Sequence, residues 1–157
     1  MNAQQVALRK MVEEDGPAAS KAIVLLPANQ DVPGTREQLV GLFSSTNLPV
    51  VATAFSQLCY QNLTLNEIAP LLASPLPQAR LMGIGALARI GDKADVDRLV
   101  ASLHDPNEAI RWLVRSNLRR LTGQKIGADP AAWEKWWAES KDTFTPQPAG
   151  RAGFRRN

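Results

Sequence analysis

The sequence predicts an all-α solenoid of about four stacked helix pairs. The main observation is a 31-residue repeat, in which two segments match position by position. The first segment supplies Ile68, Leu71, Leu72, Pro75, Ala79, Arg80, Leu87, Arg89 and Ile90. The second supplies Leu99, Ser102, Leu103, Pro106, Ile110, Arg111, Leu118, Arg120 and Leu121. Self-similarity at a fixed period of this length is typical of solenoids, whose units bury their apolar faces by stacking.

Helix-boundary residues and apolar periodicity support this prediction. Asp105 is expected as an N-cap, with Pro106 at the first helical position and Glu108 two positions later. One face of the helix that follows carries Ile110, Leu113, Val114, Asn117, Leu118 and Leu121. Gly123 is a natural end for this helix. The preceding segment, 75–90, has the same plan and ends at Gly91.

The remaining helices follow from the same register. Segments 64–73 and 93–103 are expected to be the first helices of the two clear pairs. The positions 32 residues before Ala86, Leu87 and Ile90 are again apolar, and so are the positions 64 residues before them. These residues are Ala54, Phe55 and Leu58, and then Ala22, Ile23 and Leu26. The sequence therefore predicts four helix pairs within a domain of residues 1–142, with the first two pairs degenerate and the repeats clearest over 65–141.

A tryptophan-rich helix follows the last pair. Asp129 is its expected N-cap and Pro130 its first residue, and it should end near Lys141. Its face carries Trp133, Trp136 and Trp137 at spacings i, i+3 and i+4. We expect this helix to cap the solenoid, with Trp136 and Trp137 buried against helix 106–121. A ligand cage or a stacking platform for bases is the alternative. Residues 143–157 are expected to form a flexible basic tail.

These motifs resemble a known repeat family. Ala79-Arg80 through Ile90-Gly91-Asp92, and Ile110-Arg111 through Leu121, are similar to the short bacterial HEAT repeats also called PBS-lyase HEAT-like. The stretch 121–137 resembles a C-terminal end common in bacterial HEAT-repeat proteins. The resemblance implies a right-handed α-solenoid of HEAT-like pairs. It also implies an Asp–Arg pairing that maps onto Asp105 and Arg111, and that is missing at Arg80 because Ser74 replaces the Asp.

Composition restricts the class of protein. The chain has 157 residues, 45% of them apolar and 21% charged, as in globular domains. It contains no run of 18 apolar residues, and its first residues lack the apolar core of a signal peptide. Cys59 is the only cysteine, which suits a reducing compartment. We therefore expect a cytoplasmic protein without a membrane span.

Charge is distributed unevenly along the chain. Residues 1–79 carry 4 basic and 6 acidic side chains, a net charge of −2, whereas residues 80–157 carry 14 and 9, a net charge of +5. A basic half can serve an anionic partner, but the interspersed acidic residues favour an ordinary solvated surface. A nucleic-acid partner is therefore possible from the sequence but is not favoured.

No motif indicates catalysis. The only histidine, His104, lies in a helix-to-helix turn beside Asp105, with no Ser or Cys nucleophile in the same loop. One His and one Cys cannot build an ordinary zinc site without carboxylates. Gly83 and Gly85 lie within a helix, where they favour close helix packing over phosphate binding. We predict no catalytic, cofactor-binding or metal-binding residues and no cofactor.

The most distinctive candidate for function is an exposed aromatic residue. Trp112 lies about 200° around its helix from Ile110, at the centre of the buried face, so it should face solvent. One repeat earlier, the same positions hold Leu81 and Ile84. The predicted partner-binding stripe therefore contains Leu81, Ile84, Trp112, Arg115 and Arg119. An exposed apolar stripe edged by arginines is typical of a protein interface, unless another part of the chain covers it.

The sequence thus favours a non-enzymatic scaffold or adaptor that binds a protein. One alternative is a nucleic-acid-binding protein that uses the basic C-terminal half. A second is a HEAT-like glycosylase, although the tryptophans gather in the expected cap and no Asp falls in the stripe. A HEAT-like lyase is suggested by the family name alone.

Overall fold

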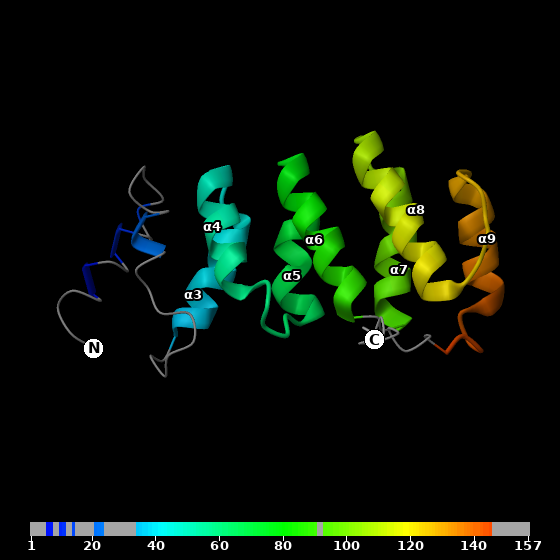
Figure 1. The fold of residues 1–157 in the computed structure, drawn as a ribbon, viewed down its shortest axis with the longest axis horizontal. Coiled ribbons are helices and arrows are strands. Elements are labelled where there is room, and N and C mark those ends of the chain that lie inside the picture. Colours follow the sequence, from blue (N-terminus) through cyan, green and yellow to red (C-terminus); the bar gives the residue numbers. More distant parts are fainter. Residues whose placement is uncertain are drawn as a thin grey trace, which may run out of the picture. The chain divides into compact units, whose positions relative to one another are not determined.

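All regular secondary structure in the described part of the chain is helical (Figure 1). The computed structural model describes residues 6–7, 10–11, 14, 21–23, 34–90 and 93–145. The chain divides into two compact units, Met1–Gly83 and Ile84–Asn157, and each is described by itself. Within the described residues, no helix has the length and apolar character needed to cross a bilayer.

The N-terminal unit is built from short helices that pack side by side. They are α3 (Thr35–Gly41), the 3₁₀ helix η1 (Leu42–Ser44), α4 (Leu48–Leu58), α5 (Leu65–Leu72) and the first part of α6 (Pro77–Ile90). The core contains Leu39, Phe43, Val50, Val51, Ala54, Leu58, Ile68 and Leu71. Ala22 and Ile23, expected as core from the repeat register, are also buried, whereas Leu26 lies outside the described residues.

The described secondary structure of the C-terminal unit is also helical. The unit comprises the end of α6, then α7 (Lys93–Ala101), the 3₁₀ helix η2 (Ser102–His104), α8 (Glu108–Thr122) and α9 (Pro130–Ser140). Its core contains Val96, Leu99, Leu103, Ile110, Val114, Leu118, Leu121, Trp133 and Trp137. In Figure 1, α7 lies against α8, and α9 packs against α7. Helix boundaries at 64–65, 93 and 122–123 agree with those predicted from capping residues and periodicity.

Among the described residues, one turn geometry occurs three times between consecutive helices. In each case a short side chain accepts a hydrogen bond from the main-chain N–H two residues later, which closes the turn locally. The donor–acceptor distances are 2.9 Å from Asn47 N to Ser45 Oγ, 3.2 Å from Leu76 N to Ser74 Oγ, and 2.8 Å from Asn107 N to Asp105 Oδ1. The repeat is therefore a repeat of turn chemistry as well as of apolar positions.

An arginine on the following helix holds two of these turns. Arg80 Nη1 donates to the carbonyl oxygens of Ser74 and Pro75, at 2.9 and 3.2 Å. Arg111 Nη1 donates to those of Asp105 and Pro106, at 2.7 and 3.1 Å. An Asp–Arg pair between position 74 and Arg80 is missing, as expected, because residue 74 is Ser, yet Arg80 holds its turn in the same way as Arg111 does. The guanidinium binds main-chain oxygens, so replacing Asp by Ser at the turn does not remove its acceptors.

The start of α8 also differs from the prediction. The N-cap is Asn107, whose Oδ1 accepts hydrogen bonds from Ala109 N at 2.9 Å and from Ile110 N at 3.3 Å. Asp105 closes the preceding turn, so the N-cap predicted there is two residues too early. An Asn and an Asp both favour an N-cap, and only the backbone path decides which one reaches the free N–H groups. The predicted end is confirmed, because Gly123 has a left-handed φ of 71°.

Close contact between α5 and α6 depends on a glycine. A Cβ at Gly83 would lie 2.9 Å from Leu72 Cδ2 and 3.1 Å from Leu71 Cβ, whereas a Cβ at Gly85 would meet nothing within 4 Å. The prediction that glycine allows close packing here is thus confirmed for Gly83 alone. Gly85 only lowers the helix propensity of α6.

Two alanine substitutions should therefore have opposite effects. We expect Gly85→Ala to raise the free energy of unfolding by about 0.5–1 kcal/mol, through helix propensity. Gly83→Ala should lower it by about 1 kcal/mol, because the overpacking against Leu72 exceeds the same propensity gain. Urea unfolding of both variants beside the wild type measures the difference. A stabilised Gly83→Ala variant would contradict the close contact.

A polar clamp joins α3 to α5 in the N-terminal unit. The Arg36 guanidinium binds both carboxylate oxygens of Glu67, at 2.6 Å from Nε and 3.0 Å from Nη2, and also donates to Gln61 Oε1 and Asn62 O. Glu67 is itself part of a capping box with Thr64. The bond from Arg36 outweighs the opposing effect of burial and, with help from Thr64, lowers the pKa of Glu67 to about 2. Two-point geometry of this kind is the stronger form of ion pair.

The clamp predicts a specific loss of stability in acid. Because folding lowers the pKa of Glu67 from 4.5 to about 2, its contribution is complete above pH 4.5 and disappears as the pH falls towards 2. Glu67→Gln should cost about 1–2 kcal/mol at neutral pH, allowing for partial exposure. Urea unfolding at pH 6.5 and pH 3 should show a smaller pH effect in Glu67→Gln than in the wild type. Equal pH effects would rule out the clamp as a source of stability.

The tryptophan helix begins as predicted but packs differently. Asp129 Oδ1 accepts from Ala131 N, with Pro130 as the first helical residue. Trp133 and Trp137 are buried, whereas Trp136, expected to be buried, is only half-buried. Trp137 Nε1 donates to Asp97 Oδ1 on α7 at 2.7 Å, so this contact joins α9 to α7 rather than to the expected helix 106–121.

Ring packing continues beyond the predicted end of the domain. Trp136 lies between Trp133 and Phe144, with ring centroids 6.0 Å away in both cases and nearly perpendicular planes. Phe144 was expected in the flexible tail, yet its ring also lies 5.4 Å from that of Trp137. Residues 146–157, the rest of the expected tail, lie outside the described residues.

The tryptophans should therefore differ in their contribution to stability. Trp133→Ala should lower the free energy of unfolding by about 3–5 kcal/mol, because the side chain is fully buried and its indole N–H donates to Gly127 O. Trp136→Ala should cost about 1–2 kcal/mol, mainly through lost ring packing. Thermal and urea unfolding of both variants check this order. If neither variant is destabilised, the aromatic cluster does not act as a structural cap.

Candidate interaction surface

The solvent-facing side of α8 carries a large exposed aromatic residue. Trp112 is 64% exposed, as the sequence predicted from its position on the helix. At 100° per residue, the side chains that share its face are those four, seven and eight positions away and their neighbours. They are Glu108, Ala109, Ser116, Arg119 and Arg120, all exposed, with Arg115 at the edge. We call this set, with Trp112, the α8 face.

One end of the α8 face is an ion-pair cluster. The Glu108 carboxylate binds Arg111 through one oxygen and Arg115 through the other, the latter at 2.9 Å. The hydrogen bonds from Arg115 and then Arg111 lower the pKa of Glu108, so the carboxylate stays charged at neutral pH. Arg115 is thereby held along α8, with a side chain only 14% exposed. These two arginines are already neutralised in part by a partner on their own helix.

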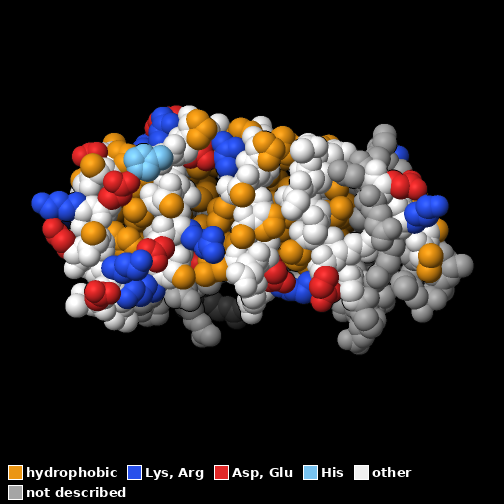
Figure 2. Space-filling view, turned by 180° about the vertical axis from the view of Figure 1, so that it is seen from behind, with side chains coloured by type: hydrophobic (Ala, Val, Ile, Leu, Met, Phe, Trp, Pro, Cys, Tyr) orange, Lys and Arg blue, Asp and Glu red, His pale blue; other side chains and the backbone are white. Residues whose placement is uncertain are grey.

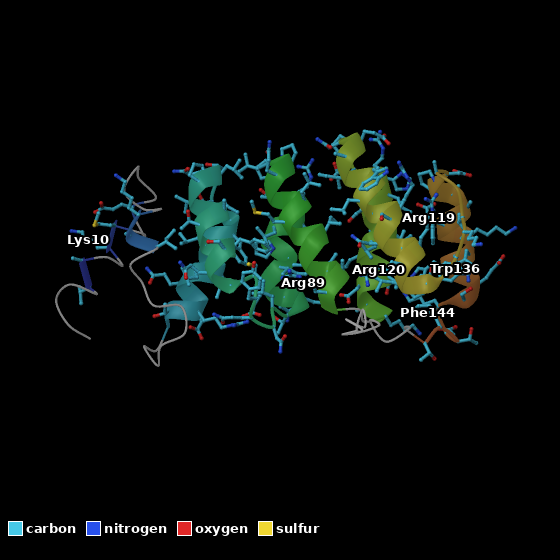
Figure 3. The ribbon with its side chains drawn as sticks, in the orientation of Figure 1. Lys10, Arg89, Arg119, Arg120, Trp136 and Phe144 are labelled. Atoms are coloured by element: carbon cyan, nitrogen blue, oxygen red, sulfur yellow. The ribbon has the colours of Figure 1, made fainter. Side chains whose placement is uncertain are left out.

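The other end of the α8 face carries two arginines that bind main-chain carbonyl oxygens. Arg119 Nε donates to Ile126 O at 3.2 Å, and Arg120 Nη2 donates to Ala88 O. Among the described residues no acidic side chain pairs with either one. Figure 3 shows both on the C-terminal part of α8, with Trp136 on the neighbouring α9 and Phe144 just after it. The carbonyl bonds orient the guanidinium groups and leave their charge available to a partner.

The predicted stripe does not extend to α6 as expected. Ile84 is only 1% exposed, so its predicted place on the surface is wrong. The physical reason is that the buried face of α6 is wide: Ile84 lies about 140° from Ala79, yet Ala79, Gly83, Ala86 and Leu87 are also buried. Leu81 is half-buried and belongs to the N-terminal unit. The surface that we consider further is therefore confined to α8.

The structure adds two residues that the sequence prediction missed. Glu108 and Arg120 are exposed on the face of Trp112, and both are charged. Their spacing of i−4 and i+8 from Trp112 is a signal that helical periodicity already contained. Alignment with Leu81 and Ile84 does not contain this signal, because it compares two helices and not the positions around α8.

Another polar contact links η2 to α9. His104 Nε2 lies 2.6 Å from Glu134 Oε1, which connects the end of η2 to α9.

Figure 2 shows basic and acidic side chains interspersed over the described residues on the side opposite to the view of Figure 1. No group of three or more His, Cys, Asp or Glu side chains in the described segments is arranged to hold a metal ion.

Comparison with known proteins identifies no relative of this chain, so the function is argued from the fold and the α8 face. A scan against models of protein families finds no match to this chain, and a search of curated proteins finds no significantly similar sequence.

Proposed function

We propose that this protein is a non-enzymatic scaffold or adaptor module that binds a protein partner through the α8 face. Its architecture would be a right-handed solenoid of about four HEAT-like helix pairs. The protein would act in the cytoplasm. The observation that carries the proposal is Trp112, a large aromatic side chain left 64% exposed on an otherwise well-packed helix. Trp and Arg are enriched among residues that dominate protein interfaces, and both types occur on this face.

The repeated turns support the solenoid part of the proposal. Arg80 and Arg111 bind the carbonyl oxygens five and six residues before them, at equivalent positions of two successive repeats. Repeat proteins bind partners through surfaces presented on a rigid stack of such units. The stability of α8 does not require Trp112, because Ile110, Val114 and Leu118 supply the buried side of that helix.

The role of Trp112 can be tested by substitution. Trp112→Ala should weaken partner binding by about 2 kcal/mol or more, roughly 30-fold in Kd, and leave the melting temperature nearly unchanged. The full chain would be used as bait in extracts of the source cells, and co-purifying proteins would be quantified by mass spectrometry for the variant and the wild type.

Tyr60→Ala is the matched control. Tyr60 is an exposed aromatic residue, 89% accessible, that lies outside α8. Proteins lost with Trp112→Ala but kept with Tyr60→Ala would define the partner. If the two variants retain the same proteins as the wild type, the α8 face does not bind a partner and the proposed function is wrong.

A further inference from the structure

Among the described residues, the charges near the α8 face are paired at one end and have no acidic partner at the other. Glu108 pairs with Arg111 and Arg115 at the N-terminal end. Arg119 and Arg120 at the C-terminal end contact only main-chain carbonyl oxygens among the described residues. The surface therefore carries a net positive charge beyond Trp112, located on two guanidinium groups whose positions are held by hydrogen bonds.

The distance between the aromatic residue and these cations is set by the helix. Trp112 and Arg119 are seven residues apart on α8, which is about 10 Å along the axis. An extended peptide covers that distance in about three residues. A ligand of matching length would therefore carry an apolar side chain and, about three residues away, one or more anionic groups.

Resting on the proposed function, we propose that the partner presents an acidic peptide segment with one apolar anchor residue. The anchor packs on the Trp112 indole, and carboxylates about three residues away bind Arg119 and Arg120. Guanidinium groups match carboxylate oxygens with two parallel hydrogen bonds, which gives both strength and orientation. Complementary charge of this kind acts mainly on association and on the choice of partner.

The same charges disfavour a nucleic acid as the occupant. A protein that neutralises about 6–10 phosphates of a duplex does so with Lys and Arg side chains. Around the α8 face, the cations without an acidic partner among the described residues are Arg119, Arg120 and Lys125, and Lys125 lies in the loop that Arg119 binds. A short peptide with a few carboxylates needs no more cations than are present.

Binding of synthetic peptides to the full chain tests the proposal. The probe is a short fluorescein-labelled peptide with one Phe followed three residues later by Glu-Glu-Asp. One counterpart carries Gln-Gln-Asn in place of the acids, and another carries Ser in place of Phe. Labelled oligothymidine of similar length is the nucleic-acid probe. Fluorescence anisotropy gives Kd for each probe at 50 and 300 mM salt.

We expect the acidic Phe peptide to bind and both counterparts to bind at least ~10-fold more weakly, with weaker binding at high salt. Trp112→Ala and the double variant Arg119→Gln/Arg120→Gln should each weaken it by a similar factor. The double variant Arg119→Lys/Arg120→Lys keeps the charge and should retain most of the binding. Lys135→Gln removes an exposed cation on α9 and should change nothing.

The remaining outcomes separate the two proposals. Equal binding of the Gln peptide, with Trp112 still required, would refute the acidic chemistry and leave the α8 face as a binding surface. Peptide binding that does not depend on Trp112 would count against the proposed function itself. Tighter, arginine-dependent binding of oligothymidine would assign the face to nucleic acid. Absence of binding by every peptide at millimolar concentration would overturn the inference, while the co-purification experiment decides the proposed function separately.

Discussion

The closed turn between paired helices is the constraint on which the described structure depends. Ser45, Ser74 and Asp105 each accept the N–H two residues later, and Arg80 and Arg111 then bind the carbonyl oxygens of the turns that precede their helices. Main-chain groups that a turn would otherwise leave unsatisfied thus have partners inside the same unit. A turn held in this way fixes where the second helix starts and which of its faces points inward.

The chemistry of the α8 face follows from that turn. Arg111 uses one guanidinium nitrogen on the turn carbonyls and offers another to Glu108. Glu108 then holds Arg115 against the helix with its second oxygen. Within the described part of the chain, no carboxylate pairs with Arg119 or Arg120, beyond Trp112, so their positive charge is left for a partner. Arg111, which holds the turn, thus also positions Glu108, and the ion pairs of Glu108 determine that Arg119 and Arg120 are the arginines left for a partner.

The aromatic cluster explains how α9 is held. Although partial burial raises the pKa of Asp97, hydrogen bonds from Trp137 and Lys141 outweigh this effect and lower it. Asp97 thus remains a charged acceptor for both, at 2.7 and 2.9 Å. Trp133 donates to Gly127 O, in the loop that Arg119 also binds through Ile126 O. Helix α9 and the C-terminal end of α8 therefore both bind this loop, which holds Arg119 in place.

The sequence by itself determined the helical class, most helix boundaries and the exposure of Trp112, because apolar periodicity and capping residues act within a few residues of one another. Gly123, Asp129 and Thr64 lie where local chemistry requires them. Tertiary structure decided the burial of Ile84 and the half-exposure of Trp136, since burial depends on how many neighbours cover a helix. It also decided that Arg80 could bind its turn without an Asp, because the acceptors are carbonyl oxygens whose direction no side-chain pattern records.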